Sequence, residues 1–468
     1  MVFELDNFNE NKALITDSKI ITYKQLKNFS EEIAETIDER CLVCLFCTNT
    51  PASIAGYVGF INHGIVPMMI DSELDIELIK NLLNLYKPKY LWLPENVSKN
   101  YSSYDKIFQL DDYVLLSTNE NQKFELNEKL ALLMTTSGST GSQKFVRQSY
   151  ENIISNTKSI IEYLNIDENE RSITNLPMHY VYGLSIINTH LYVGASIVIT
   201  DKTLFQKEFW QLFKDKEVTN FGGVPYTFTM LEKLRFFRMK LPSLKVITQA
   251  GGKLDPNLHF KFAEYAEEND KKFVVMYGAA EATARMGYLP SKDSINKCGS
   301  MGIAIPGGKF ELIDEKGNLI NKPDVVGELI YYGKNVSLGY AESGKDLIRD
   351  DERQNRLETG DLAKRDDEGY YTIVGRKKRF LKMFGKRTNL QEVEHIIYEH
   401  FGITDVACAG IDDKMYIFLT KNNEDIISYL SNKLNLHSSA FCIKVIKDIP
   451  KNTSGKIIYK KLEKYYDL

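Results

Sequence analysis

The sequence predicts an α/β protein whose parallel sheets are covered by helices on both faces, followed by a smaller C-terminal domain. Apolar strand-like runs alternate with amphipathic helical segments as far as residue 278. After about residue 300 the runs become shorter and are joined by tight turns, and beyond Gly375 a basic run leads into a last αβ segment. Alternation of this kind is typical of parallel sheets with crossover helices.

The N-terminal part begins with a helix and two strands that surround a second helix. We expect a helix in FSEEIAETIDE (29–39), with Ser30 as its N-cap. The strands CLVCLF (41–46) and IVPMMI (65–70) flank PASIAGYVGFINHG (51–64), a helix that a proline starts and a glycine stops.

Five further strands continue the alternation: ALLM (131–134), IVIT (197–200), VTNFGGVP (218–225), LKVITQAGG (244–252) and KFVVMYG (272–278). The later runs KFELIDEKGNLI (309–320), VGELIYYG (326–333) and GYYTIVG (369–375) have turns at 316–318 and 367–369, so a more antiparallel unit is expected there.

Composition and charge restrict the class of protein. The 468 residues are 43% hydrophobic and 26% charged, which is ordinary for a globular protein. A net charge of -4 gives no reason to expect nucleic acid as a partner. The two long charge-free stretches, 41–70 and 173–200, are interrupted by proline, glycine and histidine, so neither is expected to span a membrane. With no signal-like start, we expect a cytoplasmic protein.

Three of the six cysteines, Cys41, Cys44 and Cys47, have the CxxCxxC spacing of some metal sites. They lie in a predicted strand, however, where side chains alternate, so Cys44 should point away from the other two. We interpret them as core cysteines.

The segment TTSGSTGSQK (135–144) leaves a predicted strand with six hydroxyls, two glycines and a lysine. Backbone N–H groups and hydroxyls of such a loop can surround a phosphate chain, while Lys144 supplies compensating charge. The other interpretation is a solvent loop that is rich in small residues. A Walker-type P-loop needs GxxxxGK[ST], whereas Gly138, Gly141 and Lys144 give GxxGxxK, so that class of NTPase is excluded.

Five motifs in order resemble the adenylate-forming superfamily of acyl- and aryl-CoA ligases, peptide-synthetase adenylation domains and luciferases. They are TSGSTGSQK (136–144), MYGAAEA (276–282), ETGDLA (358–363), VGRKKRFLKMFGKRTNLQEVE (374–394) and PKNTSGKI (450–457).

This resemblance implies the fold and the reaction. The fold would be a large N-terminal domain (1–377) of two doubly wound sheets plus a distorted β-barrel, with a small mobile α+β lid (378–468). A carboxylate would attack the α-phosphate of ATP, in the presence of Mg²⁺, to give an acyl adenylate and pyrophosphate. A thiol, from CoA or from the phosphopantetheine of an acyl carrier protein in trans, would then displace AMP.

The resemblance also implies roles for individual residues. ATP would be bound by the loop and by later motifs: Thr136, Ser137, Gly138, Ser139, Thr140, Gly141, Lys144, Gly251, Gly252, Tyr277, Gly278, Asp361, Arg376 and Lys456. Thr140 of this set, together with Glu281, would hold Mg²⁺, and Thr140, Glu281 and Lys456 are counted as catalytic. Tyr277 would stack on adenine and Asp361 would accept the ribose hydroxyls. Without the motifs, Tyr277 would be a core tyrosine and Asp361 a turn residue.

Two residues of the C-terminal part have implied roles. Lys456 would bridge the substrate carboxylate and the α-phosphate and so promote the first half-reaction. Lys378 would be the hinge of the lid, whereas its neighbours Lys377 and Arg379 are expected to be solvated.

The acid pocket is implied to include His179, Phe221, Gly222, Gly223, Val224 and Met286. Amino-acid-activating members carry an aspartate where this chain has His179, so we expect an uncharged tail, as in a fatty or aryl acid. Amino-acid adenylation with loading of a separate carrier protein is the alternative. A non-catalytic nucleotide-binding module is a third possibility, but it would not need Lys456.

Overall fold

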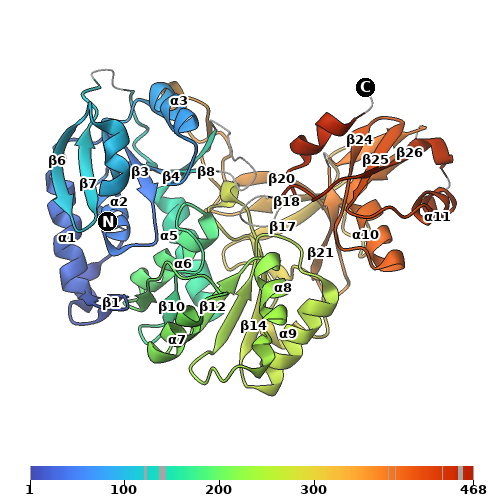
Figure 1. Cartoon of the computed structure of the whole chain (residues 1–468), viewed down its shortest axis with the longest axis horizontal. Coiled ribbons are helices and arrows are strands. Elements are labelled where there is room, and N and C mark those ends of the chain that lie inside the picture. The colour runs from blue at the N-terminus through green and yellow to red at the C-terminus, as the bar shows by residue number, and fades with distance from the viewer. Residues whose placement is uncertain are drawn as a thin grey trace. The chain divides into compact units, whose positions relative to one another are not determined.

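The computed structural model describes residues 2–120, 124–135, 144–377, 379–384, 386–434, 436–451 and 457–466. Its contacts divide the chain into two compact units (Figure 1): 1–309 with 331–357, and 310–330 with 358–468. The antiparallel sheet that follows residue 309 thus groups mainly with the C-terminal segment. The predicted boundary of a moving lid at residue 378 remains a prediction.

The first unit contains an eight-stranded sheet in the order β19-β9-β8-β4-β3-β5-β7-β6. At its centre β4, β3 and β5 run parallel, and β8 is parallel to β4. Its strands are β3 (Leu42–Cys47), β4 (Val66–Asp71), β5 (Tyr90–Pro94), β6 (Asp105–Leu110), β7 (Tyr113–Ser117), β8 (Leu130–Thr135), β9 (Phe145–Ser149) and β19 (Gly339–Ala341). The helices of this part are α1 (Tyr23–Glu35), α2 (Pro51–Asn62), α3 (Ile76–Tyr86) and α4 (Glu95–Ser98).

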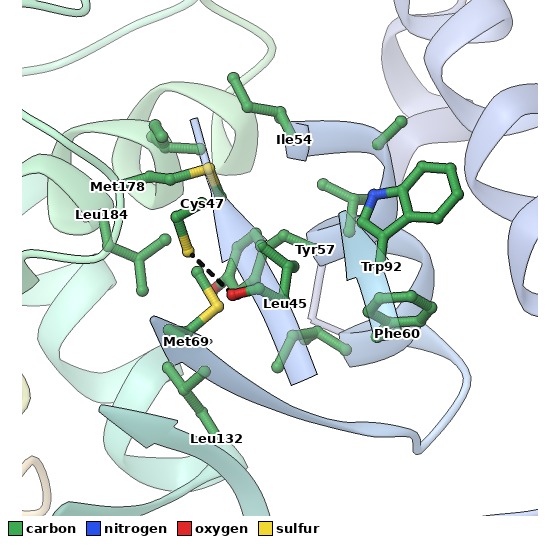
Figure 2. Close-up of a cluster of buried hydrophobic side chains, with 14 of the residues drawn as sticks. Leu45, Cys47, Ile54, Tyr57, Phe60, Met69, Trp92, Leu132, Met178 and Leu184 are labelled. Carbon is green, nitrogen blue, oxygen red and sulfur yellow. Dashed lines mark hydrogen bonds between the residues drawn. The ribbon is translucent and has the colours of Figure 1, made fainter. Parts of the chain in front are cut away.

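Helices cover both faces of this sheet, as the sequence predicts. Alternate residues of β3 enter two different clusters: Cys47 packs with α1 and α2, and Cys44 packs with α3. The cysteines therefore point to opposite faces, as expected from strand geometry. Figure 2 shows Met178 and Leu184 in the same cluster as Cys47, so this core also fixes the start of the later helix α6 (Val181–Tyr192).

The second sheet of this unit has the order β12-β13-β14-β15-β16, and its first three strands are parallel. The strands are β12 (Asn220–Gly223), β13 (Val246–Gln249), β14 (Lys272–Tyr277), β15 (Gly287–Tyr288) and β16 (Ile303–Ala304). A smaller sheet joins β10 (Arg171–Ile173), β11 (Ser196–Val198), β1 (Lys12–Ile15) and β2 (Ile20–Thr22). The accompanying helices are α5 (Tyr150–Leu164), α6, α7 (Lys207–Asp215), α8 (Pro225–Lys233) and α9 (Pro256–Glu268).

The predicted N-cap of the first helix is wrong. Helix α1 begins at Tyr23, where Thr22 accepts from the backbone N–H of Gln25 and the Gln25 side chain accepts from Thr22 N–H in return. This capping box satisfies two backbone donors that a helix otherwise leaves unpaired. Ser30 lies inside the helix, and its hydroxyl donates to Leu26 O at 2.7 Å.

The second unit holds the four-stranded sheet β17-β18-β20-β21 and a three-stranded sheet, β24-β25-β26. The strands are β17 (Lys309–Ile313), β18 (Gly327–Tyr332), β20 (Arg356–Arg365), β21 (Tyr371–Arg376), β22 (Phe380–Met383), β23 (Lys386–Asn389), β24 (Val406–Ile411), β25 (Lys414–Leu419) and β26 (Phe441–Val445), with helices α10 (Leu390–Phe401) and α11 (Asp425–Leu434). None of the sheets formed by the described strands closes on itself, so a closed barrel is not observed among them. No helix in the described part of the chain is both long and apolar enough to cross a membrane.

Candidate active site

Three parallel strands of the second sheet end at one edge, where several predicted site residues gather. Their register pairs Gly223 with Gln249, and Gln249 with Val275, so the segments after β12, β13 and β14 leave the sheet side by side. Tyr277 ends β14, and Gly251 lies two residues beyond the end of β13. The carboxyl edge of parallel strands is the usual position of ligand sites in α/β proteins.

Two glycines at this edge are required by their surroundings. Gly251 has φ +89°, and a Cβ there would lie 2.6 Å from the Tyr180 hydroxyl oxygen. A Cβ on Gly278 would lie 1.7 Å from the carbonyl oxygen of Ala284. The backbone of Gly278 therefore packs directly against the carbonyl group of Ala284. Only glycine, which has no Cβ, permits this approach.

The predicted phosphate lysine and the predicted metal ligand meet at a tyrosine that the sequence analysis missed. Glu281 lies in the turn Ala280–Ala282, and its Oε1 accepts from the hydroxyl of Tyr340 at 2.6 Å. The Lys144 ammonium group lies 3.8 Å from the centre of the Tyr340 ring. Tyr340 thus joins β19 to both predicted residues. No motif around Val336–Tyr340 indicated this role.

The surroundings of Tyr340 keep its hydroxyl protonated. Burial, and after it the charge of Glu281, raises the pKa of Tyr340 to about 12. The hydroxyl therefore remains a donor to the carboxylate at neutral pH. Arg353 lies over the same ring at 4.6 Å and also donates to the backbone carbonyl of Glu281 at 3.3 Å.

A cavity of about 370 Å³ opens beside this group. Three cations and three carboxylates contribute to its walls together with Gly339 and Tyr340: Lys144, Arg349, Arg353, Glu342, Asp346 and Glu352. The volume lies within the range of small-molecule sites. Several of these charges pair with one another: Lys144 Nζ is 3.5 Å from Glu342 Oε1, and Arg349 Nη2 is 2.8 Å from Asp346 Oδ1.

The loop predicted to bind phosphate begins and ends at paired strands. Thr135 ends β8 and is the register partner of Phe145 in β9, and the Thr135 hydroxyl donates to the carbonyl of His179 at 3.4 Å. The predicted residues Thr136, Ser137, Gly138, Ser139, Thr140 and Gly141, and also Lys378 and Lys456, lie outside the described residues. Their assignments remain predictions.

In the second unit the structure pairs two predicted nucleotide-binding residues. Asp361 of β20 is the register partner of Arg376 of β21, and Arg376 Nε donates to Asp361 Oδ1 at 2.9 Å. The Asp361 side chain is 8% exposed and that of Arg376 is 65% exposed. A mostly buried carboxylate whose partner reaches into solvent is compatible with the predicted role of Asp361 as an acceptor.

The prediction that Arg379 is solvated is wrong. Its guanidinium makes a bidentate ion pair with Glu394, at 2.8 and 3.1 Å, and lies 3.9 Å from the centre of the Tyr459 ring. The planar fork of arginine favours this contact. The pair joins the basic run to helix α10 and to the C-terminal segment.

His179 lies in the loop before α6, and its Nε2 is 3.7 Å from Asp71 Oδ2 at the end of β4. Burial lowers the pKa of His179, although the charge of Asp71 opposes this. The imidazole is thus mainly neutral at pH 7. Of the other predicted pocket residues, Phe221, Gly222 and Gly223 lie in β12, Val224 follows it and Met286 precedes β15. A Cβ on Gly222 would lie 2.9 Å from the Tyr182 hydroxyl oxygen.

The comparisons with known proteins identify the family. A family model described as "AMP-binding enzyme" matches residues 4–341, and the chain belongs to this family. This confirms the resemblance to adenylate-forming enzymes that the motifs indicated.

Relatives and solved structures agree with this assignment. The chain is 24% identical to the long-chain-fatty-acid–CoA ligase of Bacillus subtilis (strain 168), over 90% of this chain and 84% of the relative. It is 26% identical to the 2-succinylbenzoate–CoA ligase of Staphylococcus epidermidis, over 96% and 94%. Among solved structures, ATP-bound MatB from Rhodopseudomonas palustris superimposes with a TM-score of 0.80 at 19% identity, covering 99% of this chain and 97% of that one. The last likeness confirms the predicted two-domain α/β fold.

Proposed function

We propose that the protein is an AMP-forming acid–CoA ligase. A carboxylate oxygen of the substrate attacks the α-phosphorus of ATP, and pyrophosphate leaves. The sulfur of the CoA thiolate then attacks the carbonyl carbon of the acyl adenylate, and AMP leaves. Membership of the AMP-binding family supports this proposal, together with relatives that are named as CoA ligases.

The observation that carries the proposal is the meeting of Lys144, Tyr340 and Glu281 beside the 370 Å³ cavity. Lys144 follows the hydroxyl-rich loop, so an ammonium group and backbone N–H groups converge on one anionic ligand. The carboxylate of Glu281 is a ligand type that Mg²⁺ prefers, and its orientation is fixed by Tyr340. Together with Thr140 it would hold the metal, which neutralises phosphate charge when bound.

Further nucleotide-binding roles are proposed for single residues within each unit. Tyr277 lies against adenine, with Gly251 and Gly252 allowing close approach of the backbone. Asp361 accepts from the ribose hydroxyls. Lys456 bridges the two anions that react in the first step.

The proposal also specifies which thiol accepts the acyl group. Each relative above bears the name of a CoA ligase, which supports CoA as the acceptor. The alternative, amino-acid adenylation with transfer to a carrier protein, is disfavoured by His179. Amino-acid-activating members hold the substrate ammonium with a carboxylate at this position, and the imidazole of His179, which burial keeps mainly neutral, cannot supply that charge.

Acid-dependent exchange of labelled pyrophosphate into ATP tests the first half-reaction. We expect exchange with at least one carboxylic acid from a panel of aliphatic, aromatic, dicarboxylic and amino acids, and loss of that exchange when EDTA removes Mg²⁺. Release of AMP should then require CoA rather than a phosphopantetheinylated carrier. Absence of exchange with every acid would overturn the proposed function.

A further inference from the structure

A buried arginine lies under the carboxyl edge of the second sheet without a carboxylate partner. Arg285 follows the MYGAAEA motif and is 3% exposed. Its guanidinium donates to Ser185 Oγ at 3.3 Å and to the carbonyl of Ala284 at 3.3 Å, and its Nε lies 3.4 Å from Met276 Sδ. Among the described residues, no Asp or Glu side chain forms an ion pair with it.

The ring of Tyr182 compensates only part of this charge. The guanidinium carbon lies 4.0 Å from the centre of that ring, in cation–π geometry. Such a contact is weaker than a hydrogen-bonded ion pair in a dry site. A buried charge without an opposite charge destabilises the fold. A buried arginine of this kind is therefore a candidate for binding an anionic ligand.

Arg285 contributes to the wall of a second cavity of about 30 Å³, distinct from the cavity beside Tyr340. Most of its exposed wall is apolar, from Ile160, Leu164, Ile166, Ile186, Val246 and Met276. Hydroxyl, amide and imidazole groups make up the smaller polar part: Tyr182, Ser185, Thr189, Thr248, Asn220 and His190. The cavity holds about one water-sized group, which is room for a terminal polar group but not for a long acyl chain.

One acidic residue, Glu170, also lies in the wall, but its charge is already compensated. Lys245 donates to Glu170 Oε1 at 2.8 Å, and the Thr219 hydroxyl donates to Oε2. The positive charge of Arg285 is therefore the one that an incoming anion would meet.

The cavity lies next to a residue of the predicted acid pocket. A Cβ on Gly222 would lie 2.9 Å from the Tyr182 hydroxyl oxygen and 3.1 Å from Thr248 Oγ1, and both of these side chains line the cavity. An acid whose reacting carboxylate lies at the strand ends would direct its tail toward Arg285.

We propose that Arg285 determines acid specificity, and that the substrate is a short dicarboxylic acid whose second carboxylate is bound by this guanidinium. The inference rests on the proposed ligase function. It replaces the expectation of an uncharged tail: His179 argues against an ammonium group, and Arg285 argues for an anion. A bidentate arginine–carboxylate pair would supply the missing opposite charge, and Ser185 and Thr248 offer further hydrogen bonds.

The test compares acids that differ only at the far end. Pyrophosphate exchange by the full chain is measured with succinate against butanoate, glutarate against pentanoate, and hexanedioate against hexanoate. We expect kcat/KM to be at least 100-fold higher for the preferred dicarboxylate than for its matched monocarboxylate. Arg285→Met should lower this ratio to within about threefold of one, mainly through the KM of the dicarboxylate, and Arg285→Lys should restore part of it.

The control is Arg238→Met, which removes an exposed arginine and should leave the ratio unchanged. A wild-type protein that uses monocarboxylates as well as their dicarboxylate partners overturns the inference, whether or not the Arg285 variants fold. If Arg285→Met and Arg285→Lys each lowered kcat/KM equally for dicarboxylates and for monocarboxylates, the inference would also be overturned. No exchange with any acid would instead remove the proposed function on which it rests.

Discussion

At the scale of single residues, Tyr340 shows how a side chain without a motif can organise a site. Its hydroxyl donates to Glu281 at 2.6 Å. The cationic groups of Lys144 and Arg353 lie over its ring in cation–π contacts. The hydrogen bond restrains the carboxylate that is proposed to hold Mg²⁺, and such outer contacts influence metal affinity strongly.

Tyr340→Phe should raise the Mg²⁺ concentration needed for half-maximal pyrophosphate exchange by about tenfold, because Glu281 loses its restraint. Titration of MgCl₂ at fixed ATP measures this. Tyr331→Phe is the matched control, since it removes another buried hydroxyl that donates to Asn335 at 2.8 Å. It should lower stability without changing the Mg²⁺ requirement. Equal Mg²⁺ requirements in the two variants would contradict the role of Tyr340.

Two buried histidines should make the fold sensitive to acid. Burial lowers the pKa of His190 and of His259 from 6.5 to about 4. The unfolded chain therefore takes up protons below pH 6.5 that the folded chain does not, and stability falls as the pH drops from 6.5 toward 4. Each histidine should cost about 2 kcal/mol between pH 7 and pH 4.5.

Urea unfolding at pH 7 and pH 4.5 measures this loss. His259→Gln should reduce the difference in unfolding free energy between the two pH values, because a glutamine does not titrate. His437→Gln is the control, since His437 is exposed. An unchanged difference in His259→Gln would show that other groups cause the acid sensitivity.

At the scale of elements, the turn after β14 depends on glycine. A Cβ at Gly278 would meet the carbonyl oxygen of Ala284 at 1.7 Å, whereas a Cβ at Gly252 would meet only Pro225 Cγ, at 3.2 Å. Gly278→Ala must therefore separate the turn from β14 and displace both Tyr277 and Glu281.

We expect Gly278→Ala to destabilise the protein by about 1–3 kcal/mol or more, and to weaken ATP binding. Gly252→Ala should cost less than about 1 kcal/mol. Thermal unfolding without ligand compares the stability of the two variants. Unfolding of Gly278→Ala with MgATP then measures the weaker binding, because a bound ligand raises the unfolding temperature according to its affinity. Equal losses of stability in the two variants would contradict the close contact at Gly278.

At the scale of the whole molecule, each of the two units carries residues with a predicted role. Lys144, Tyr277 and Glu281 belong to the first unit, and Asp361 belongs to the second. Lys456, near the C-terminal end, is proposed to act in the first half-reaction alone.

Lys456→Ala should slow adenylate formation by about 100- to 1,000-fold. Two unit charges 4 Å apart interact by about 4 kcal/mol at an effective dielectric near 20, which corresponds to a rate effect of this size. Thioester formation from a supplied acyl adenylate and CoA should remain within about threefold of wild type. Single-turnover assays of each step measure this. An equal loss in both steps would assign another role to Lys456.

Much of the fold could be predicted from the sequence because its signals are local. Uninterrupted apolar runs such as 41–46 and 65–70 became the buried parallel strands β3 and β4. Pro51 starts α2 as expected. The first helix was misplaced because Thr22 and Ser30 are both good N-caps, and only the reciprocal bonds with Gln25 choose between them.

The site was only partly predictable, for a different reason. Lys144, Glu281 and Asp361 stand in motifs that indicate their chemistry. Tyr340 and Arg285 carry no recognised pattern, and their importance depends on which distant residues surround them. Arg379 was misjudged because a basic run looks the same whether or not Glu394 and Tyr459 cover one of its members.

The sequence by itself determined the class of enzyme and the α/β fold, since the spacing of apolar residues and the order of the motifs are local properties of the chain. Only the tertiary structure decided that Glu281 and Lys144 meet at Tyr340 and that Arg285 remains buried without an acidic partner. Those facts depend on contacts between segments far apart in the chain, where packing sets the distances and the desolvation that give a charge its function.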